Sequence, residues 1–146
     1  MKPIILFRFS HFLFKHSIPF LPKIITIVIR FLYACYLPAS LKAGKGLKLG
    51  YGGLGIVIHN RCIIGDNCHI DQNVTLGGTS KKYEVPVIGN NVYIGAGAKV
   101  IGPVIIGDNV VIGANAVVVK DIPSKSLVVG VPGRIIKTEI KMSDYA

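Results

Sequence analysis

The chain has 146 residues, with 17 Lys or Arg against 7 Asp or Glu and a formal net charge of +10 at pH 7. This length fits one domain, and three cysteines without a Cys-x-x-Cys pair argue against a disulfide framework and for a reducing compartment. Residues 1–65 hold nine basic and no acidic side chains, which points to an anionic partner near that end, either a membrane surface or a pyrophosphate. Nucleic acid is not expected, because no binding module is present and the basic residues alternate with aliphatic ones.

Residues 1–40 form a hydrophobic and basic segment, in which we expect two short helices at about 4–15 and 22–36. The longest uncharged stretch is too short to span a bilayer. The segment is also a poor signal peptide, because charged residues interrupt its apolar run. Two hypotheses remain open for this segment. The helices cap the open end of the domain that follows, or residues 1–37 lie in a membrane interface with Lys and Arg on anionic headgroups.

Residues 41–136 carry a six-residue repeat. An aliphatic anchor returns at every sixth position, and the fourth residue after each anchor is small or apolar. A period of six fits neither an amphipathic helix nor the strands of a sandwich. It predicts an all-β domain, a parallel β-helix with three short strands in each turn of about eighteen residues, followed by a tail at 137–146. The anchors are Ile58, Ile64, Ile70, Leu76, Ile88, Ile94, Val100, Ile106, Ile112 and Val118.

The repeat resembles the hexapeptide-repeat acyltransferases, most closely the branch of serine acetyltransferases and O-acetyltransferases of bacterial surface polysaccharides. The strings that carry this resemblance are IGDNCHIDQNVTLGGT, VIGNNVYIGAGAKVIGPVIIGDNVVIGANAVVVKDIP and VVGVPGRII. The resemblance implies a left-handed β-helix, which departs from the usual right-handed crossover. It also implies a homotrimer that binds acetyl-CoA, the acyl donor, between protomers. No metal is expected.

Acetyl transfer to a hydroxyl needs a base near neutral pH, and histidine suits this role. His59 follows an inward anchor, where most hexads carry a small residue, and a break in a regular repeat marks a functional position. We therefore expect His59 to be the general base. Asp71, across a trimer interface, is the candidate that fixes its tautomer, and Glu84 in the loop is the rival; the alternative for either is a solvated surface acid. His69 is expected to be a merely exposed residue at a corner. The expected acceptor-binding residues are Tyr51, Asn73, Lys82 and Glu84.

A strip of small residues is expected to hold the donor. The pairs Gly95-Ala96 and Gly113-Ala114 are eighteen residues apart, so they should stack on successive coils and leave backbone amides open to an extended pantetheine. The alternative is that hexads favour small residues there in any case. Residues 79–87 are expected to leave the repeat as a loop, because Lys82 would otherwise point into an apolar core. The expected donor-binding residues are Gly78, Thr79, Gly95, Ala96, Lys99, Gly113, Ala114, Lys120 and Arg134, with Lys125 as a further phosphate contact.

Two departures from the serine acetyltransferase pattern favour another acceptor. That family carries its catalytic histidine in an Asp-His-x-x-Gly string and an Arg-His pair in a later loop, whereas residues 50–55 and 79–87 here contain no histidine. The string GIVIH resembles the polysaccharide branch instead. We therefore expect an acetyl-CoA-dependent O-acetyltransferase acting on a sugar hydroxyl of a bacterial surface polysaccharide or its activated precursor, in the cytoplasm or at the inner face of the cell membrane. The alternatives are a serine O-acetyltransferase, a metal-dependent hydratase and a non-enzymatic assembly protein.

Overall fold

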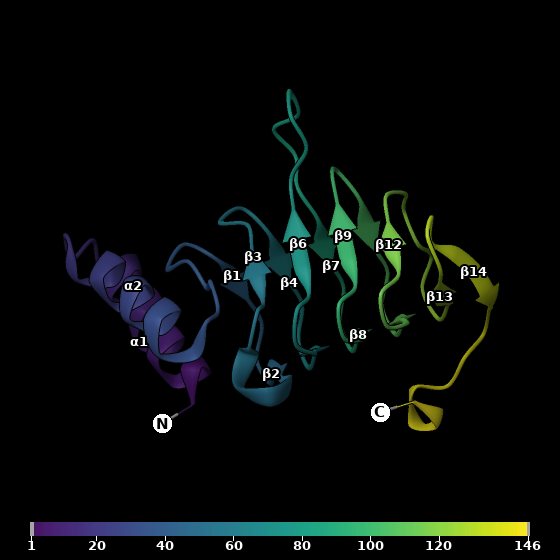
Figure 1. The fold of residues 1–146 in the computed structure, drawn as a ribbon, viewed down its shortest axis with the longest axis horizontal. Helices are drawn as coiled ribbons and strands as arrows, with labels where there is room; N and C mark the ends of the chain where they lie inside the picture. Colours follow the sequence, from purple (N-terminus) through teal and green to yellow (C-terminus); the bar gives the residue numbers. More distant parts are fainter. Residues whose placement is uncertain (1, 146) are drawn as a thin grey trace.

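A computed structural model describes residues 2–145 and shows a β-helix with two helices at its N-terminal end (Figure 1). Helix α1 spans Pro3–Lys15 and helix α2 spans Leu21–Tyr33. The strands that follow form three sheets, two of which contain four strands, so the predicted parallel β-helix is confirmed with about four turns.

The three sheets are the three faces of the β-helix. The first sheet contains β1 (Lys42–Ala43), β4 (Ile63–Ile64), β7 (Val87–Ile88) and β10 (Ile105–Ile106). The second sheet contains β2 (Lys48–Leu49), β5 (His69–Ile70), β8 (Tyr93–Ile94), β11 (Val111–Ile112), β13 (Leu127–Val129) and the antiparallel β14 (Arg134–Lys137). The third sheet contains β3 (Val57–Ile58), β6 (Thr75–Gly77), β9 (Lys99–Ile101) and β12 (Val117–Val118).

The repeat anchors fill the interior of the β-helix. Ile70, Ile94 and Ile112 are aligned on β5, β8 and β11, and all three are fully buried. Burial of such rows on every turn supplies the main stabilisation of the fold. Asparagines turn the chain at the corners, because asparagine tolerates the left-handed backbone conformation. The asparagines with positive φ are Asn67, Asn73, Asn91, Asn109 and Asn115.

Helix α1 covers the open first coil. Phe7 is fully buried in the core, and the guanidinium group of Arg8 donates hydrogen bonds to the carbonyl oxygens of Ala43 and Gly44 at the end of β1. Helix α2 ends three residues before the expected Tyr36. It ends there because Ala34 adopts a left-handed conformation and Tyr36 already pairs with Val57 of β3. The helix pair therefore caps the β-helix.

Apolar side chains remain exposed on both helices and on the turn between them. Phe20 and Phe31 have 81% and 84% of their surface exposed, and Phe9, Phe12 and Leu32 are also exposed. Within residues 2–145, no helix has both the length and the apolar character required to cross a membrane.

Candidate active site

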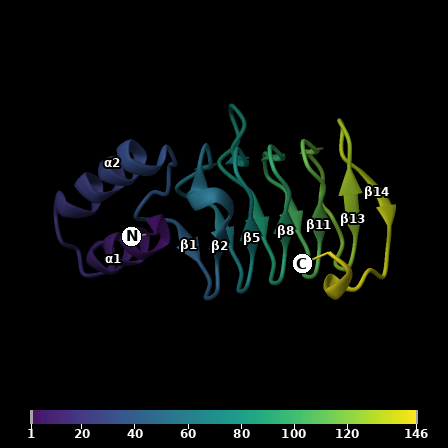
Figure 2. The same ribbon diagram turned by 60° about the horizontal axis from the view of Figure 1, so that its bottom comes forward.

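The passage from the second sheet to the third forms a corner built largely from small residues. Four segments make this corner, and each follows a strand of the second sheet. These strands lie side by side in Figure 2. We call the four segments the small-residue corner: 50–56, 71–74, 95–98 and 113–116. The backbone N–H of Asp71 donates to the Ile94 carbonyl oxygen at 2.9 Å, and that of Gly95 donates to the Ile112 carbonyl oxygen at 2.8 Å. Asp71, Gly95 and Gly113 consequently stack on successive coils.

The two glycines of the expected donor strip are required by the stacking of the coils. A Cβ atom on Gly95 would lie 2.8 Å from the backbone nitrogen of Ala114, and one on Gly113 would lie 2.9 Å from Cγ1 of Val129. These contacts leave no space for a side chain, with or without a ligand. Ala114 is exposed and Ala96 is half-buried, so the alanines form the part of the strip that a ligand can contact.

The passage from the third sheet to the first forms a second corner. Segments 59–62 and 78–86 make this loop corner, and the longer segment projects from the β-helix between β6 and β7 (Figure 1), as expected for the interrupted repeat. A Cβ atom on Gly78 would lie 3.9 Å from Cδ2 of His59, so His59 lies at the base of this loop. The loop residues Thr79, Lys82 and Glu84 are exposed.

The contacts of His59 come from its own corner. Its Nδ1 atom accepts a hydrogen bond from the backbone N–H of Arg61 at 3.2 Å. Burial, with a smaller contribution from the charge of Arg61, lowers the pKa of His59, so the ring is neutral at pH 7. A neutral ring that accepts at Nδ1 carries its proton on Nε2, so His59 can act as a base only after Nδ1 releases the N–H of Arg61.

Arg61 also holds the projecting loop. Its Nε and Nη2 atoms donate to the carbonyl oxygen of Tyr83 at 3.1 and 2.6 Å, and Cζ lies 4.2 Å from the centre of the Tyr83 ring. This combination of hydrogen bonds and a cation–π contact ties the loop to the segment that carries His59.

The other histidine of the repeat has an acidic partner. His69 lies in β5 and not at a corner as expected, and its Nε2 atom is 3.3 Å from Oδ1 of Asp71. The phenol of Tyr93 donates to Oδ2 of Asp71 at 2.6 Å, and the rings of Tyr93 and His69 meet edge to face with centres 5.2 Å apart. The hydrogen bond to Asp71, followed by burial, raises the pKa of Tyr93 to about 12, so Tyr93 remains a donor at neutral pH.

Asp71 therefore contacts His69 and Tyr93 within one chain. The expected pairing of Asp71 with His59 is not formed among residues 2–145, since the two residues lie at different corners. Glu84, the rival partner, is exposed in the projecting loop at the His59 corner. A pairing between Asp71 and His59 requires a second copy of the chain.

Three other expected residues lie at the small-residue corner or beside it. Tyr51 is exposed in the short 3₁₀ turn Gly50–Gly53, and Asn73 lies one coil further along, over Gly55. Lys99 of β9 donates from Nζ to the carbonyl oxygens of Asn73 at 2.7 Å and of Gly97 at 2.8 Å. The ammonium group of Lys99 is thus hydrogen-bonded to the backbone of the small-residue corner.

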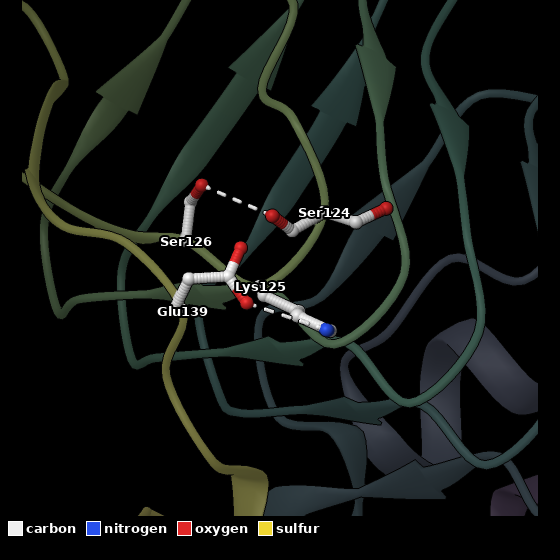
Figure 3. Close-up of polar contacts among 4 residues, drawn as sticks. All are labelled: Ser124, Lys125, Ser126 and Glu139. Atoms are coloured by element: carbon white, nitrogen blue, oxygen red, sulfur yellow. Dashed lines mark hydrogen bonds and ion pairs between the residues drawn. The ribbon is translucent and has the colours of Figure 1, made fainter.

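The remaining basic candidates do not gather at one place. Lys120 follows β12 at the loop corner and is exposed, whereas Arg134 is exposed in β14. Lys125 precedes β13 and forms an ion pair of 3.3 Å with Glu139, as Figure 3 shows beside the contact between Ser126 and Ser124. An exposed pair of this kind contributes about 1 kcal/mol or less to stability, but it offsets the charge that Lys125 would offer to a phosphate.

The cysteines provide no nucleophile. Cys35, Cys62 and Cys68 are buried and unpaired, and burial raises the pKa of Cys35 and of Cys62 to about 11. These two thiols therefore remain protonated at neutral pH. Within residues 2–145, no group of three His, Cys, Asp or Glu side chains is arranged to hold a metal ion.

The stacked hexads and the two corners define a hexapeptide-repeat protein. Residues 86–120 match the family model described as bacterial transferase hexapeptide (six repeats), and the chain belongs to the hexapeptide-repeat acyltransferase family. It is 42% identical over 137 residues to a serine acetyltransferase of Synechococcus elongatus, covering 92% of this chain and 56% of that protein. It is 38% identical over 131 residues to a serine acetyltransferase of Bacillus subtilis, covering 88% and 60% respectively.

Solved structures show the same similarity. The serine acetyltransferase of Neisseria gonorrhoeae superposes with a TM-score of 0.89 at 33% identity, covering 95% of this chain and 55% of that one. The enzyme of Brucella abortus in complex with coenzyme A superposes with a TM-score of 0.88 at 33% identity, covering 94% and 56%. The chain thus spans somewhat more than half the length of these relatives. The sugar acceptor predicted from the sequence is wrong, because relatives similar over most of the chain are serine acetyltransferases.

Proposed function

We propose that the chain transfers the acetyl group of acetyl-CoA to the hydroxyl group of serine. The observation that carries this proposal is the 42% identity over 92% of the chain with a serine acetyltransferase. The similarity includes the β-helix and both helices, since the matched structures cover up to 95% of the chain. A relative solved in complex with coenzyme A supports the choice of donor.

The small-residue corner is the proposed donor surface. Ala96 and Ala114 present little side chain, so an extended pantetheine can lie against the backbone there. Neighbouring coils are about 4.8 Å apart, which places Asp71 about one coil spacing from Gly95 and about two from Gly113. An acceptor near Asp71 would therefore lie within reach of a thioester held on this strip.

His59 remains our sequence-based proposal for the base, and it requires a second copy of the chain. The first sheet supports such an assembly, because Ile63, Val87 and Ile105 form an exposed apolar row on its outer surface. A row of this kind is typical of a surface that is covered in an oligomer. We propose a homotrimer, in which a loop corner of one chain meets a small-residue corner of another.

A membrane contact through residues 1–37 also remains a proposal. The exposed phenylalanines of the helix pair lie among basic residues, and the first 65 residues contain no acidic side chain. Such a surface suits the interface of an anionic bilayer. Self-association is the competing use of the same apolar surface.

The reaction is tested by thiol release from acetyl-CoA with serine as acceptor. Threonine, nucleotide sugars and isolated polysaccharide are the comparison acceptors, and mass spectrometry identifies the acetylated product. We expect O-acetylserine and free coenzyme A in equal amounts. Acetylation of the sugars with none of serine would refute the proposed acceptor.

A further inference from the structure

We propose that the chain binds one anionic phospholipid in a groove between the helix pair and the loop corner. In this site the phosphate group contacts Lys42 and Arg61, and an acyl chain extends from there to the turn between α1 and α2. The inference rests on the proposed membrane contact of residues 1–37 and assigns it a specific lipid site. It is independent of which acceptor receives the acetyl group.

The groove consists of two adjoining cavities. The first, of about 500 Å³, lies between the α1–α2 turn and the segment that leads into β1, and the second, of about 450 Å³, continues to the loop corner. Phe14, Ser40 and Asn60 line both cavities, so the two are continuous. Ser40 marks the junction, where its hydroxyl group donates to the Asn60 carbonyl oxygen at 3.3 Å.

The end of the groove at the α1–α2 turn is apolar. Ile18, Phe20 and Pro22 line it, although 81% of the surface of Phe20 is exposed. Phe20 also has a φ of 63°, a left-handed conformation that is unfavourable for a bulky residue. Backbone strain of this kind is found at ligand contacts, where the surroundings compensate for it. An acyl chain provides such a contact, because it covers both the ring and the cavity wall.

The other end of the groove is basic. Lys42 and Arg61 line it together with Tyr83. Arg61 uses Nε and Nη2 to bind the carbonyl oxygen of Tyr83, so its Nη1 atom can donate to a phosphate oxygen. Lys42 is exposed in β1, and the two ion pairs found among residues 2–145 involve neither Lys42 nor Arg61. Both cations are therefore available to an anionic group.

The charge of the groove favours an anionic lipid over a zwitterionic one. None of the described residues that line the two cavities is acidic, and residues 1–65 contain no Asp or Glu. Glu84, which follows Tyr83 in the loop, is exposed and lines neither cavity. Lys23 lies at the apolar end, where its stem can follow the acyl chain while its ammonium group reaches neighbouring headgroups.

The polarity of the groove matches the orientation of a lipid in a bilayer. Insertion of the exposed Ile18 and Phe20 brings the apolar end of the groove to the acyl region. Lys42 and Arg61 then lie toward the headgroups. The α1–α2 turn is at the end of the molecule opposite β14, as Figure 1 shows. A membrane lipid can therefore enter the groove without leaving the bilayer completely.

The test is an NMR titration with the soluble lipid dihexanoyl phosphatidylglycerol below its micelle concentration. We expect Lys42→Gln to weaken the Kd about fivefold, because it removes one cation at the phosphate. Lys45→Gln is the matched control, since Lys45 is exposed in the turn after β1 and lines neither cavity. Its Kd should stay within about twofold of the parent. Equal losses in the two variants would overturn the site, because net charge alone would then explain the binding.

Two further measurements test the acyl chain. Ser40→Phe fills the junction of the two cavities and should weaken the Kd about tenfold or more, with thermal unfolding as the control for the fold. Glycerol phosphate, which lacks acyl chains, should bind about 100-fold more weakly than the lipid. A folded Ser40→Phe protein that binds the lipid like the parent would overturn the proposal, as would equal binding of glycerol phosphate and lipid.

The proposed membrane contact can fail separately from the lipid site. Sedimentation with vesicles of phosphatidylcholine and phosphatidylglycerol tests the contact, whereas the titration tests the groove. Lipid binding in solution without sedimentation would reject the membrane contact and support the groove. A parent protein that binds no lipid in solution would overturn the groove, and smaller oligomers of Ser40→Phe would then show that a second copy of the chain covers it. Neither measurement requires turnover.

Discussion

Replacement of Ala114 by tyrosine should block the surface on which we place the pantetheine arm of the donor. Ala114 is exposed at the small-residue corner, so the new ring would lie across the strip and leave the core intact. If the ring displaces about 100 Å² of buried apolar contact, the loss is about 2.5 kcal/mol at 25 cal/mol per Å². This corresponds to a Kd for coenzyme A that is about 70-fold weaker.

The assay is isothermal titration of coenzyme A, together with thermal unfolding. Ile136→Tyr is the matched control, because Ile136 is exposed in β14, away from the corner. Both variants should keep their stability within about 0.5 kcal/mol of the parent. A folded Ala114→Tyr protein whose Kd stays within threefold of the parent would move the donor site elsewhere on the molecule.

Ile105→Lys should dissociate the oligomer, because it places a charge in the exposed apolar row of the first sheet, and light scattering at micromolar concentration measures this. A monomeric parent would contradict the trimer. Replacement of Phe20 and Phe31 by serine should reduce sedimentation of the protein with anionic vesicles, and added salt should also reduce it. A parent protein that does not sediment with such vesicles at low salt would exclude the membrane contact. Because the pKa of Tyr93 is raised, its hydrogen bond to Asp71 stabilises the fold below pH 10, and this stabilisation is lost as the pH rises toward 12. In a pH titration followed by tyrosinate absorbance, Tyr93→Phe should remove the component that titrates at the highest pH.

The repeat of six residues was sufficient to predict the β-helix, the inward anchors and the projecting loop. Each anchor must be apolar because it faces the interior of the β-helix, so the repeat can be recognised directly in the amino-acid sequence. Corner asparagines such as Asn91 and Asn109 are a further signal that the repeat argument did not use, since five of them share the left-handed conformation. The helix end was less predictable. The pairing of Tyr36 with Val57 ends α2 early, and this long-range contact leaves no local trace.

The candidate site was harder to predict because it depends on which residues become neighbours between coils. The glycines at 95 and 113 look like room for a ligand in the sequence, whereas in the structure they make room for the next coil. His69 looks unremarkable beside His59, which breaks the repeat. Its contacts depend on Tyr93, which lies opposite His69 only because the loop at 78–86 delays the next turn. Once this loop is placed outside the repeat, the sequence does predict that pairing.

Mixed oligomers test whether the base and the donor surface of one site belong to different chains. His59→Asn removes the proposed base at the loop corner, and Ala114→Tyr blocks the proposed strip at the small-residue corner. If one chain supplies the base and its neighbour supplies the strip, about a quarter of the sites in random trimers of the two variants would combine two intact parts. Chains of the two variants, unfolded and refolded together, should therefore recover thiol release toward a quarter of the parent level. A mixture that stays as inactive as either variant alone would refute the interface site and favour a site within one chain.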